Sequence, residues 1–162
     1  MSVVIRTDRL ELRALDAAGA RSVLRGAPPD DLSWAYGYPL PFTLEAAAMI
    51  LEDEPAAHGR GPFVSFQVLR RADSLVVGDC GFGAPPDSAG LVEIRYELVR
   101  QSRRRGLESE ALEALIGFAF TRDEVVAVRA WAPSGDSAAQ RTLKRAGMMN
   151  VGEQDGRVCF EA

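Results

Sequence analysis

A short run of the sequence concentrates positive charge directly before a glycine, at Arg100, Arg103, Arg104, Arg105 and Gly106. The residues before this run have the pattern of a strand and those after it the pattern of a helix, which predicts a loop leading into a helix N-terminus. Backbone N–H groups at such a terminus lack partners within the helix, and the helix dipole adds partial positive charge. Phosphate is the anion best suited to these donors. The run is therefore a candidate phosphate-binding loop, and the alternative is a basic turn exposed to solvent.

Other familiar chemistry is excluded by what the sequence lacks. It contains neither Gly-x-Gly-x-x-Gly nor Gly-Lys-Ser/Thr, so a dinucleotide-binding or P-loop fold is not indicated. His58 is the only histidine, and a Ser-His-Asp or Cys-His mechanism would have to use it. There is no Cys/His cluster, so we expect no metal.

Carboxylates on the strand before the loop could move protons. Glu93 and Glu97 are an even number of residues apart and face the same side of that strand. Glu93 could act as a general base, directly or through water; the alternative is a surface carboxylate paired with an arginine such as Arg13 or Arg95. Tyr96 faces the opposite side and is expected in the core.

The surrounding elements must place this loop and strand. Apolar alternation or β-rich composition predicts seven strands, at residues 10–15, 63–69, 75–82, 91–99 and 125–131 and on both sides of the Asp155-Gly156 turn. Helices are predicted from the cap Asp16 to about Arg25 and from Thr43 to His58-Gly59. Two more follow Gly106 and run from Asp136 to Gly147. This order predicts a mixed α/β or α+β fold in a single domain, residues 1–162.

Composition limits the partners. A chain of 162 residues with 47% hydrophobic residues is the size of one globular domain. Its net charge of −4 argues against nucleic acid. No stretch approaches the ~20 apolar residues of a membrane span, and no secretory signal is visible. Cys80 and Cys159 lie in apolar contexts and are expected to be buried free thiols, which suits the cytoplasm.

The sequence resembles the GNAT superfamily of acyl-coenzyme-A-dependent N-acetyltransferases, in the branch of the ribosomal-protein-alanine acetyltransferases. The segments that carry the resemblance are residues 7–13, 41–46, 77–82, 92–96, 103–111 and 136–148. Residues 103–111 occupy the coenzyme-binding motif Gln/Arg-x-x-Gly-x-Gly/Ala, and residues 136–148 the motif that begins Asn-x-x-Ser. The resemblance implies a GNAT fold: a central, mostly antiparallel twisted sheet of about seven strands that splays midway, with about four flanking helices.

The resemblance also implies a reaction and a site. An amine attacks the thioester of acetyl-coenzyme A in the slot where the strands splay, and a strand N–H near Leu98 or Val99 stabilises the oxyanion. Because no cysteine falls in the segments lining that slot, direct transfer is expected. The implied coenzyme-binding residues are Leu98, Val99, Arg100, Arg103, Arg104, Arg105, Gly106, Leu107, Glu108, Ser109 and Asp136. Glu93 is the candidate base, a role that strand carboxylates have in some members.

Three positions depart from the family pattern. Glu108 stands where the family has Gly or Ala, and its charge would oppose a phosphate unless it turns away to pair with Arg104 or Arg105. Arg95 replaces a glycine. Asp136 and Ala139 replace Asn and Ser, which leaves Ser137 as the nearest hydroxyl to reprotonate the thiolate. These departures motivate the alternative of a degenerate member that binds a ligand or partner, or uses another donor, without acetyl transfer.

The acceptor is expected to be a small-molecule or peptide amine, including a protein N-terminus. In the branch, the loop holding Trp34, Tyr36 and Tyr38 borders the acceptor pocket, so these residues are candidates for substrate binding; the alternative is that they pin the loop to the core. Acidic residues nearby would suit a cationic amine or simply be solvated: Asp30, Asp31 and Glu45. Either a monomer or a homodimer is compatible with the sequence.

Overall fold

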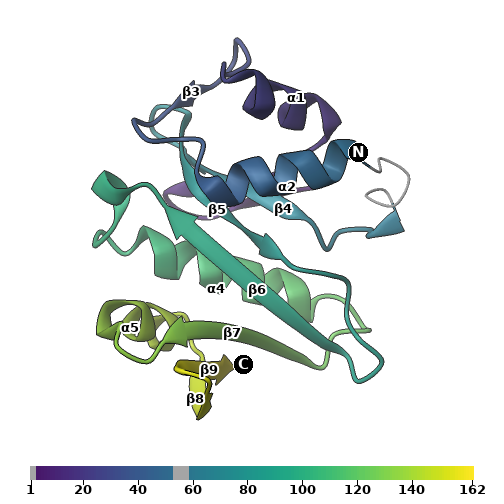
Figure 1. The fold of residues 1–162 in the computed structure, drawn as a ribbon, viewed down its shortest axis with the longest axis vertical. Coiled ribbons are helices and arrows are strands. Elements are labelled where there is room, and N and C mark those ends of the chain that lie inside the picture. Colours follow the sequence, from purple (N-terminus) through teal and green to yellow (C-terminus); the bar gives the residue numbers. More distant parts are fainter. Residues whose placement is uncertain (1–2, 53–58) are drawn as a thin grey trace.

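One continuous sheet organises the computed structural model, which describes residues 3–52 and 59–162 (Figure 1). Nine strands occur in the order β1-β2-β4-β5-β6-β7-β9-β8, with β3 pairing to β5 outside this path. The strands are β1 Val4–Arg6, β2 Leu10–Ala14, β3 Ser33–Trp34, β4 Ser65–Arg70, β5 Leu75–Phe82, β6 Leu91–Leu98, β7 Ala127–Pro133, β8 Met149–Gln154 and β9 Arg157–Glu161. The described helices are α1 Ala17–Arg25, α2 Pro41–Glu52, α4 Leu107–Phe120 and α5 Ser137–Arg145, with a 3-10 turn, η1, at Arg100–Ser102. None of these helices combines the length and apolarity needed to cross a membrane.

The mixed, mostly antiparallel architecture is confirmed, with two strands more than expected. The additional strands are β1, of three residues, and β3, of two. Both are too short for alternation to reveal them, since a strand pattern needs four or more residues. They form because a longer neighbour provides an edge to pair with: β1 pairs with β2, and β3 with β5.

Helix α2 begins at Pro41, not at Thr43 as expected. Proline is well suited to a first helical position, where its missing N–H costs no helical hydrogen bond. Thr43 has another role: its hydroxyl accepts the Leu40 N–H at 3.0 Å and donates to Asp79. The expected end of this helix, at His58-Gly59, involves residues 53–58, which lie outside the described residues.

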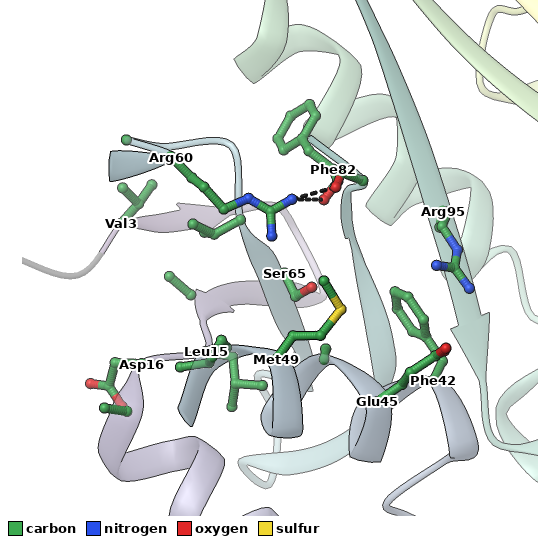
Figure 2. A pocket seen from close by; sticks show the side chains of 17 residues that line it. Val3, Leu15, Asp16, Phe42, Glu45, Met49, Arg60, Ser65, Phe82 and Arg95 are labelled. Atoms are coloured by element: carbon green, nitrogen blue, oxygen red, sulfur yellow. Dashed lines mark hydrogen bonds between the residues drawn. The ribbon is translucent and has the colours of Figure 1, made fainter. Parts of the chain in front are cut away.

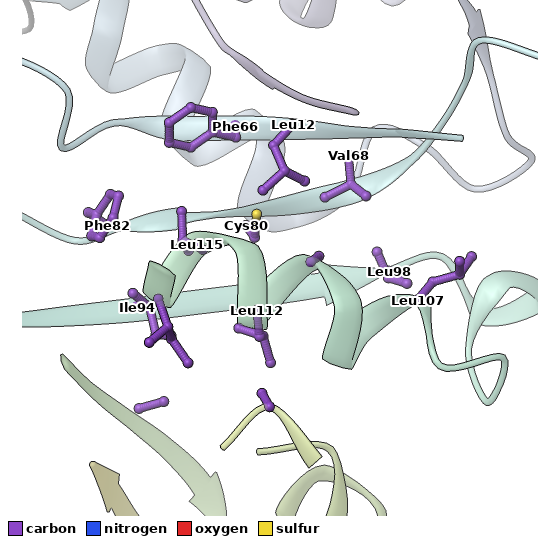
Figure 3. Close-up of a cluster of buried hydrophobic side chains, with 14 of the residues drawn as sticks. Leu12, Phe66, Val68, Cys80, Phe82, Ile94, Leu98, Leu107, Leu112 and Leu115 are labelled. Carbon is purple, nitrogen blue, oxygen red and sulfur yellow. The ribbon is translucent and has the colours of Figure 1, made fainter. Parts of the chain in front are cut away.

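Helix α4 packs its apolar face on one side of the sheet, while α2 lies on the other side (Figure 1). Leu107, Leu112 and Leu115 project from α4 toward sheet side chains such as Phe66 and Leu98 (Figure 3). Each fully buried side chain of this size contributes about 1.5–3 kcal/mol. This packing fixes the N-terminal end of α4 relative to the end of β6. Cys80 and Cys159 are both buried and free, as expected.

Gly78 permits the close pairing of β5 with β6. A Cβ at this position would lie 2.2 Å from the Glu97 carbonyl oxygen, which is backbone and cannot move aside cheaply. The pairing runs from Gly78 opposite Leu98 to Phe82 opposite Ile94. Glycine is thus required for β6 to keep its register along β5.

A buried carboxyl group joins α2 and the preceding aromatic loop to the sheet. Asp79 on β5 accepts hydrogen bonds from the Tyr38 hydroxyl, at 2.8 Å, and from the Thr43 hydroxyl. Gln67 Nε2 donates to the Tyr38 oxygen at 3.0 Å. Burial raises the pKa of Asp79 to about 7, although the two hydroxyl donors favour its charged form.

This pKa makes the stability of the fold depend on pH. The folded Asp79 holds its proton up to about pH 7, whereas the unfolded one releases it near about pH 3.9. We therefore expect the free energy of unfolding to fall as pH rises from about 4 to about 7, by up to about 4 kcal/mol from this group. Asp79→Asn should remove that contribution, measured by urea unfolding at pH 5 and pH 8.

Tyr38→Phe provides the matched control. It removes a donor that stabilises the charged form, so it should make the loss of stability between pH 5 and pH 8 steeper. If the wild type and Asp79→Asn lost equal stability over this range, Asp79 would not be the titrating group.

Candidate functional site

The two parallel strands at the centre of the sheet pair only at their beginning. β6 and β7 are in register at Leu91 opposite Ala127, Val92 opposite Val128 and Glu93 opposite Arg129, and not beyond. From there β6 continues along β5, and β7 pairs with β9 up to Pro133. The sheet therefore splays after Glu93, as expected, and the edge of β6 that faces β7 is left open.

Backbone donors and acceptors on that open edge come from even-numbered residues. Odd-numbered residues of β6 bond toward β5, as shown by Val99 N–H donating to the Val77 carbonyl at 2.8 Å and Gly83 N–H donating to the Glu93 carbonyl at 3.1 Å. Because bonding direction alternates along a strand, the N–H groups of Tyr96 and Leu98 face the splay. Of the two amides expected to serve an oxyanion, that of Val99 is thus used within the sheet, and Leu98 keeps its own available.

The loop after β6 exposes several backbone N–H groups at one point. Arg104 and Gly106 have positive φ angles of 65° and 77°, a backbone pattern that forms anion-binding concavities. No side chain caps α4, and its first helical hydrogen bond comes from Glu110 N–H to the Gly106 carbonyl at 3.1 Å. The amides of Leu107, Glu108 and Ser109 therefore have no helical acceptor. This cradle, residues 104–109, fits a phosphate.

Contacts with the first strands fix the position of the cradle. Glu110 accepts hydrogen bonds from the Thr7 hydroxyl at 2.5 Å and from Arg9 N–H at 2.9 Å and Nε at 2.6 Å. Burial alone would raise the pKa of Glu110, but these donors hold it below its usual range. Arg9 also donates to the Arg105 carbonyl at 2.9 Å. Arg105 and Arg9 also line a hollow of about 550 Å³ on the outer side of the loop.

Glu108 competes with an anion for this cradle. Its half-buried carboxyl has a pKa raised by burial and by the charge of Asp136, while the Arg103 guanidinium and a hydrogen bond from Arg104 N–H oppose the rise. The alternative, in which Glu108 turns away to pair with the Arg104 or Arg105 side chain, does not occur among the described residues. The influence of the Arg104 N–H on its pKa places the Glu108 carboxyl near one of the cradle's own amides.

The side chain of Arg103 lies along the open edge of β6. Its Nε donates to the Leu98 carbonyl at 2.9 Å, and its terminal nitrogen is 3.8 Å from Glu97. In the described part of the chain, no carboxylate forms an ion pair with Arg100, Arg104 or Arg105. The loop therefore presents a net positive field around its amides, which attracts an anion.

Helix α5 closes the far side of the splay. Asp136 caps it, accepting the Ala139 N–H at 3.0 Å, and the side chain of Ser137 is exposed. The Tyr96 hydroxyl lies 3.5 Å from the Ala139 carbonyl, so this half-buried ring crosses from β6 to the first turn of α5. Burial, Glu108 and Asp136 raise the pKa of Tyr96, which keeps the hydroxyl protonated.

The role of Tyr96 beside the open edge was not anticipated from the sequence. It shares a strand face with the buried Ile94 and Leu98, which predicts a core position. The available signal was its hydroxyl, because a buried tyrosine O–H normally needs a partner.

Glu93 is the last residue of β6 that pairs with β7, so it lies at the vertex of the splay. Its carboxylate accepts the indole N–H of Trp131 on β7 at 2.8 Å, and the Arg157 guanidinium lies 4.5 Å from that ring. The alternative pairing with Arg13 does not occur, because Arg13 binds Glu11 and Asp31. Trp131 is only partly buried.

A cavity of about 600 Å³ lies on the face of the sheet that carries Glu93, between α2 and the ends of β4 and β5 (Figure 2). Arg95, Phe42 and Glu45 stand at one end of it and Arg60 at the other, with Met49 between them (Figure 2). Arg60 and Arg95 were not expected to share a cavity, since they are far apart in the sequence.

The aromatic loop lies beside this site but does not line the cavity. Tyr38 is buried against Asp79, and Trp34 packs edge-on to it with ring centroids 5.6 Å apart. Tyr36 is 91% exposed, and its carbonyl accepts Gln101 Nε2 at 2.7 Å, which links the loop to η1. A role for these three residues in acceptor binding stays a prediction.

Comparisons with known proteins agree with this geometry. The sequence model of the acetyltransferase (GNAT) domain family matches residues 9–149. The N-acetyltransferase YoaA of Bacillus subtilis, itself uncharacterized, is 23% identical over 152 residues, which cover 94% of this chain and 86% of that protein. YjdG of the same species is 29% identical over 92 residues, which cover 57% of this chain and only 55% of that relative.

Solved structures share the fold at low sequence identity. A GNAT-family acetyltransferase from Bacillus anthracis superposes with a TM-score of 0.69 at 15% identity, covering 99% of this chain and 98% of that one. RimL, a ribosomal α-N-protein acetyltransferase solved in complex with coenzyme A, gives 0.71 at 18% identity, with coverages of 99% and 97%. With the family match extending from β2 to β8, this chain belongs to the GNAT acetyltransferase family.

Proposed function

We propose that residues 1–162 form one acetyltransferase domain that moves an acetyl group from acetyl-coenzyme A to a primary amine by direct attack. The observation that carries the proposal is the conjunction of the amide cradle, residues 104–109, with the splay of β6 from β7. A diphosphate at the cradle and a thioester in the splay require both features side by side. The coenzyme A complex of the similarly folded RimL supports this choice of donor.

The coenzyme would lie along the loop and the open edge of β6. Amides of residues 104–109 hold the diphosphate, with Arg100, Arg103, Arg104 and Arg105 adding charge, and the hollow beside Arg105 gives room for further phosphate. Arg103 must leave the Leu98 carbonyl, since the pantetheine arm uses the same edge. Val99 and Asp136 border this path.

The thioester would meet the amides of the open edge. When an amine attacks the carbonyl carbon, negative charge develops on its oxygen, and a preorganised backbone N–H lowers that barrier by about 2.7–4 kcal/mol. The N–H groups of Leu98 and Tyr96 face the splay and suit this role.

Glu93 is proposed as the base. It lies at the vertex of the splay, and the Trp131 indole holds its carboxylate in place. The attacking ammonium must lose a proton to become a nucleophile, and Glu93 accepts it directly or through water.

The departing thiolate needs a proton when the C–S bond breaks. Ser137 is one source, but its side chain is exposed at the start of α5. The Tyr96 hydroxyl is favoured, because its strand forms the edge of the splay and its oxygen reaches α5 at Ala139. Covalent transfer through cysteine has no support, since burial raises the pKa values of both Cys80 and Cys159.

The rival function is that of a degenerate family member, which binds a ligand or partner, or uses another donor, without acetyl transfer, and Glu108 is the observation that favours it. Its half-buried carboxylate lies close enough to the cradle for the Arg104 N–H to lower its pKa. Acetyl transfer requires that the diphosphate displace this group or bind beside it.

Calorimetric titration of the wild type and of Glu108→Gln with acetyl-coenzyme A decides between the two functions. Removing the charge should tighten binding at pH 8 by about 3- to 30-fold, since a like charge nearby costs up to about 3 kcal/mol before solvent screening. The difference in affinity between wild type and variant should decrease as pH falls, because the raised pKa of Glu108 lets it take up a proton at a higher pH than an ordinary glutamate does. Glu113→Gln, exposed on the same helix, is the control. Absence of binding by wild type and variant at millimolar coenzyme would favour the degenerate protein.

Glu93→Gln keeps an oxygen to accept the Trp131 N–H but cannot take up a proton. We expect kcat at pH 7 to fall by about 10²- to 10⁴-fold with the affinity for acetyl-coenzyme A unchanged. Thiol release followed in a spectrophotometric assay measures the first quantity and calorimetry the second. Full turnover by this variant would remove Glu93 from the mechanism.

Tyr96→Phe and Ser137→Ala separate the two sources of the final proton. Loss of the Tyr96 hydroxyl should lower kcat by about 10- to 100-fold without weakening coenzyme binding, whereas Ser137→Ala should stay within about twofold of wild type. The opposite ranking would return the role to Ser137.

A further inference from the structure

The cavity beside Arg95 has an apolar body and a charged mouth. Its lining is mostly apolar, with Leu15, Ala46, Met49, Ile50 and Val64 among the contributors. A volume of about 600 Å³ falls within the range of small-molecule sites. The interior therefore suits an apolar side chain of modest size and not a long polycation.

Arg95 is a cation without a carboxylate partner among the described residues. Its guanidinium lies 4.4 Å from the centroid of the Phe42 ring, which fixes its plane and leaves its N–H edge available. The acidic neighbours on its own strand face are already engaged: Glu93 with Trp131, and Glu97 with Arg103. Arg60, at the other end, donates to the Phe82 and Gly83 carbonyls.

A guanidinium without a carboxylate partner is well suited to bind the carboxylate of a ligand. Its paired N–H donors match the two oxygens of a carboxylate, which a lysine or a neutral side chain cannot reproduce.

The position of Arg95 relates the carboxylate to the reacting amine. Its neighbour Tyr96 directs its N–H into the splay, and Glu93 lies two residues away on the same face as Arg95. A ligand whose amine and carboxylate are bound to one carbon can thus place the first at the splay and the second at Arg95. Glu45 stands at the same mouth as Arg95, which favours a ligand that carries a positive as well as a negative charge (Figure 2).

From this arrangement we infer that the acceptor is a free α-amino acid with an apolar side chain, its carboxylate bound by Arg95 and its side chain in the cavity. The inference rests on the proposed acetyltransferase function and narrows its substrate class. A protein N-terminus lacks the free α-carboxylate. A polycationic amine would need several available carboxylates, but Asp31 is paired with Arg13 and Asp30 does not line the cavity. Asp16 caps α1, which leaves Glu45 alone among the described lining residues.

The test varies the ligand and the residue together. Leucine, methionine and phenylalanine are each compared with their amides and with the amines that lack the carboxyl group, using thiol release and mass spectrometry of the products. For the wild type, kcat/KM should be at least tenfold higher for one or more of the amino acids than for its amide and its carboxyl-free amine. Arg95→Gln should lower kcat/KM for the amino acids about 10- to 100-fold and leave the other amines within about threefold.

Arg60→Gln is the matched control within the same cavity. Its arginine contacts backbone carbonyls, so the variant should affect all three ligand types alike. Equal kcat/KM for amino acids and carboxyl-free amines would overturn the inference. So would acetylation of peptide N-termini alone. A protein that binds acetyl-coenzyme A but acetylates no amine in the panel would overturn it as well. Failure to bind acetyl-coenzyme A in the calorimeter would instead contradict the proposed function itself.

Discussion

The parting of β6 from β7 after Glu93 is the constraint on which the rest of the site depends. A strand with partners on both sides has no free backbone groups, so an unbroken sheet would offer nothing to a thioester. β5 holds β6 over its C-terminal half, and Gly78 allows the close approach that this needs. β7 instead pairs with β9. The open edge is therefore confined to the splay, and β7 is not left unpaired along its length.

The splay also gives the two faces of β6 different tasks. Even-numbered side chains face α4 and α5, where Ile94 and Leu98 join the core and Tyr96 reaches the first turn of α5. Odd-numbered side chains face the side of α2, where Arg95 lines the cavity and Glu93 accepts the Trp131 N–H. Coenzyme chemistry and acceptor chemistry can therefore meet at one strand without sharing side chains, because the reacting bond would lie in the plane of the sheet.

Much of this arrangement could be predicted from periodicity and turn chemistry. Strand β5 matches its expected bounds, Asp16 caps α1 as expected, and the Asp155-Gly156 turn joins β8 to β9 with both residues at positive φ. Contacts between distant segments could not be predicted in this way. Thr43 looks like a helix cap in sequence, but a buried carboxyl on β5 takes its hydroxyl. Likewise, nothing in the spacing of Arg60 and Arg95 indicates a shared cavity, since only the pairing of β4 with β5 and of β5 with β6 brings them together.

Glu108 shows why local sequence alone could not decide the character of the loop. A carboxylate at this position looks incompatible with phosphate when judged by charge. In the folded chain its pKa is raised by burial, and Arg103, which also contacts the open edge of β6, opposes that shift. Glu108 and Arg103 therefore lie where the diphosphate and the pantetheine arm of the proposed complex would bind. An anion that binds the cradle must displace these charged side chains or bind beside them. Its net free energy of binding is therefore smaller than the number of free amides suggests.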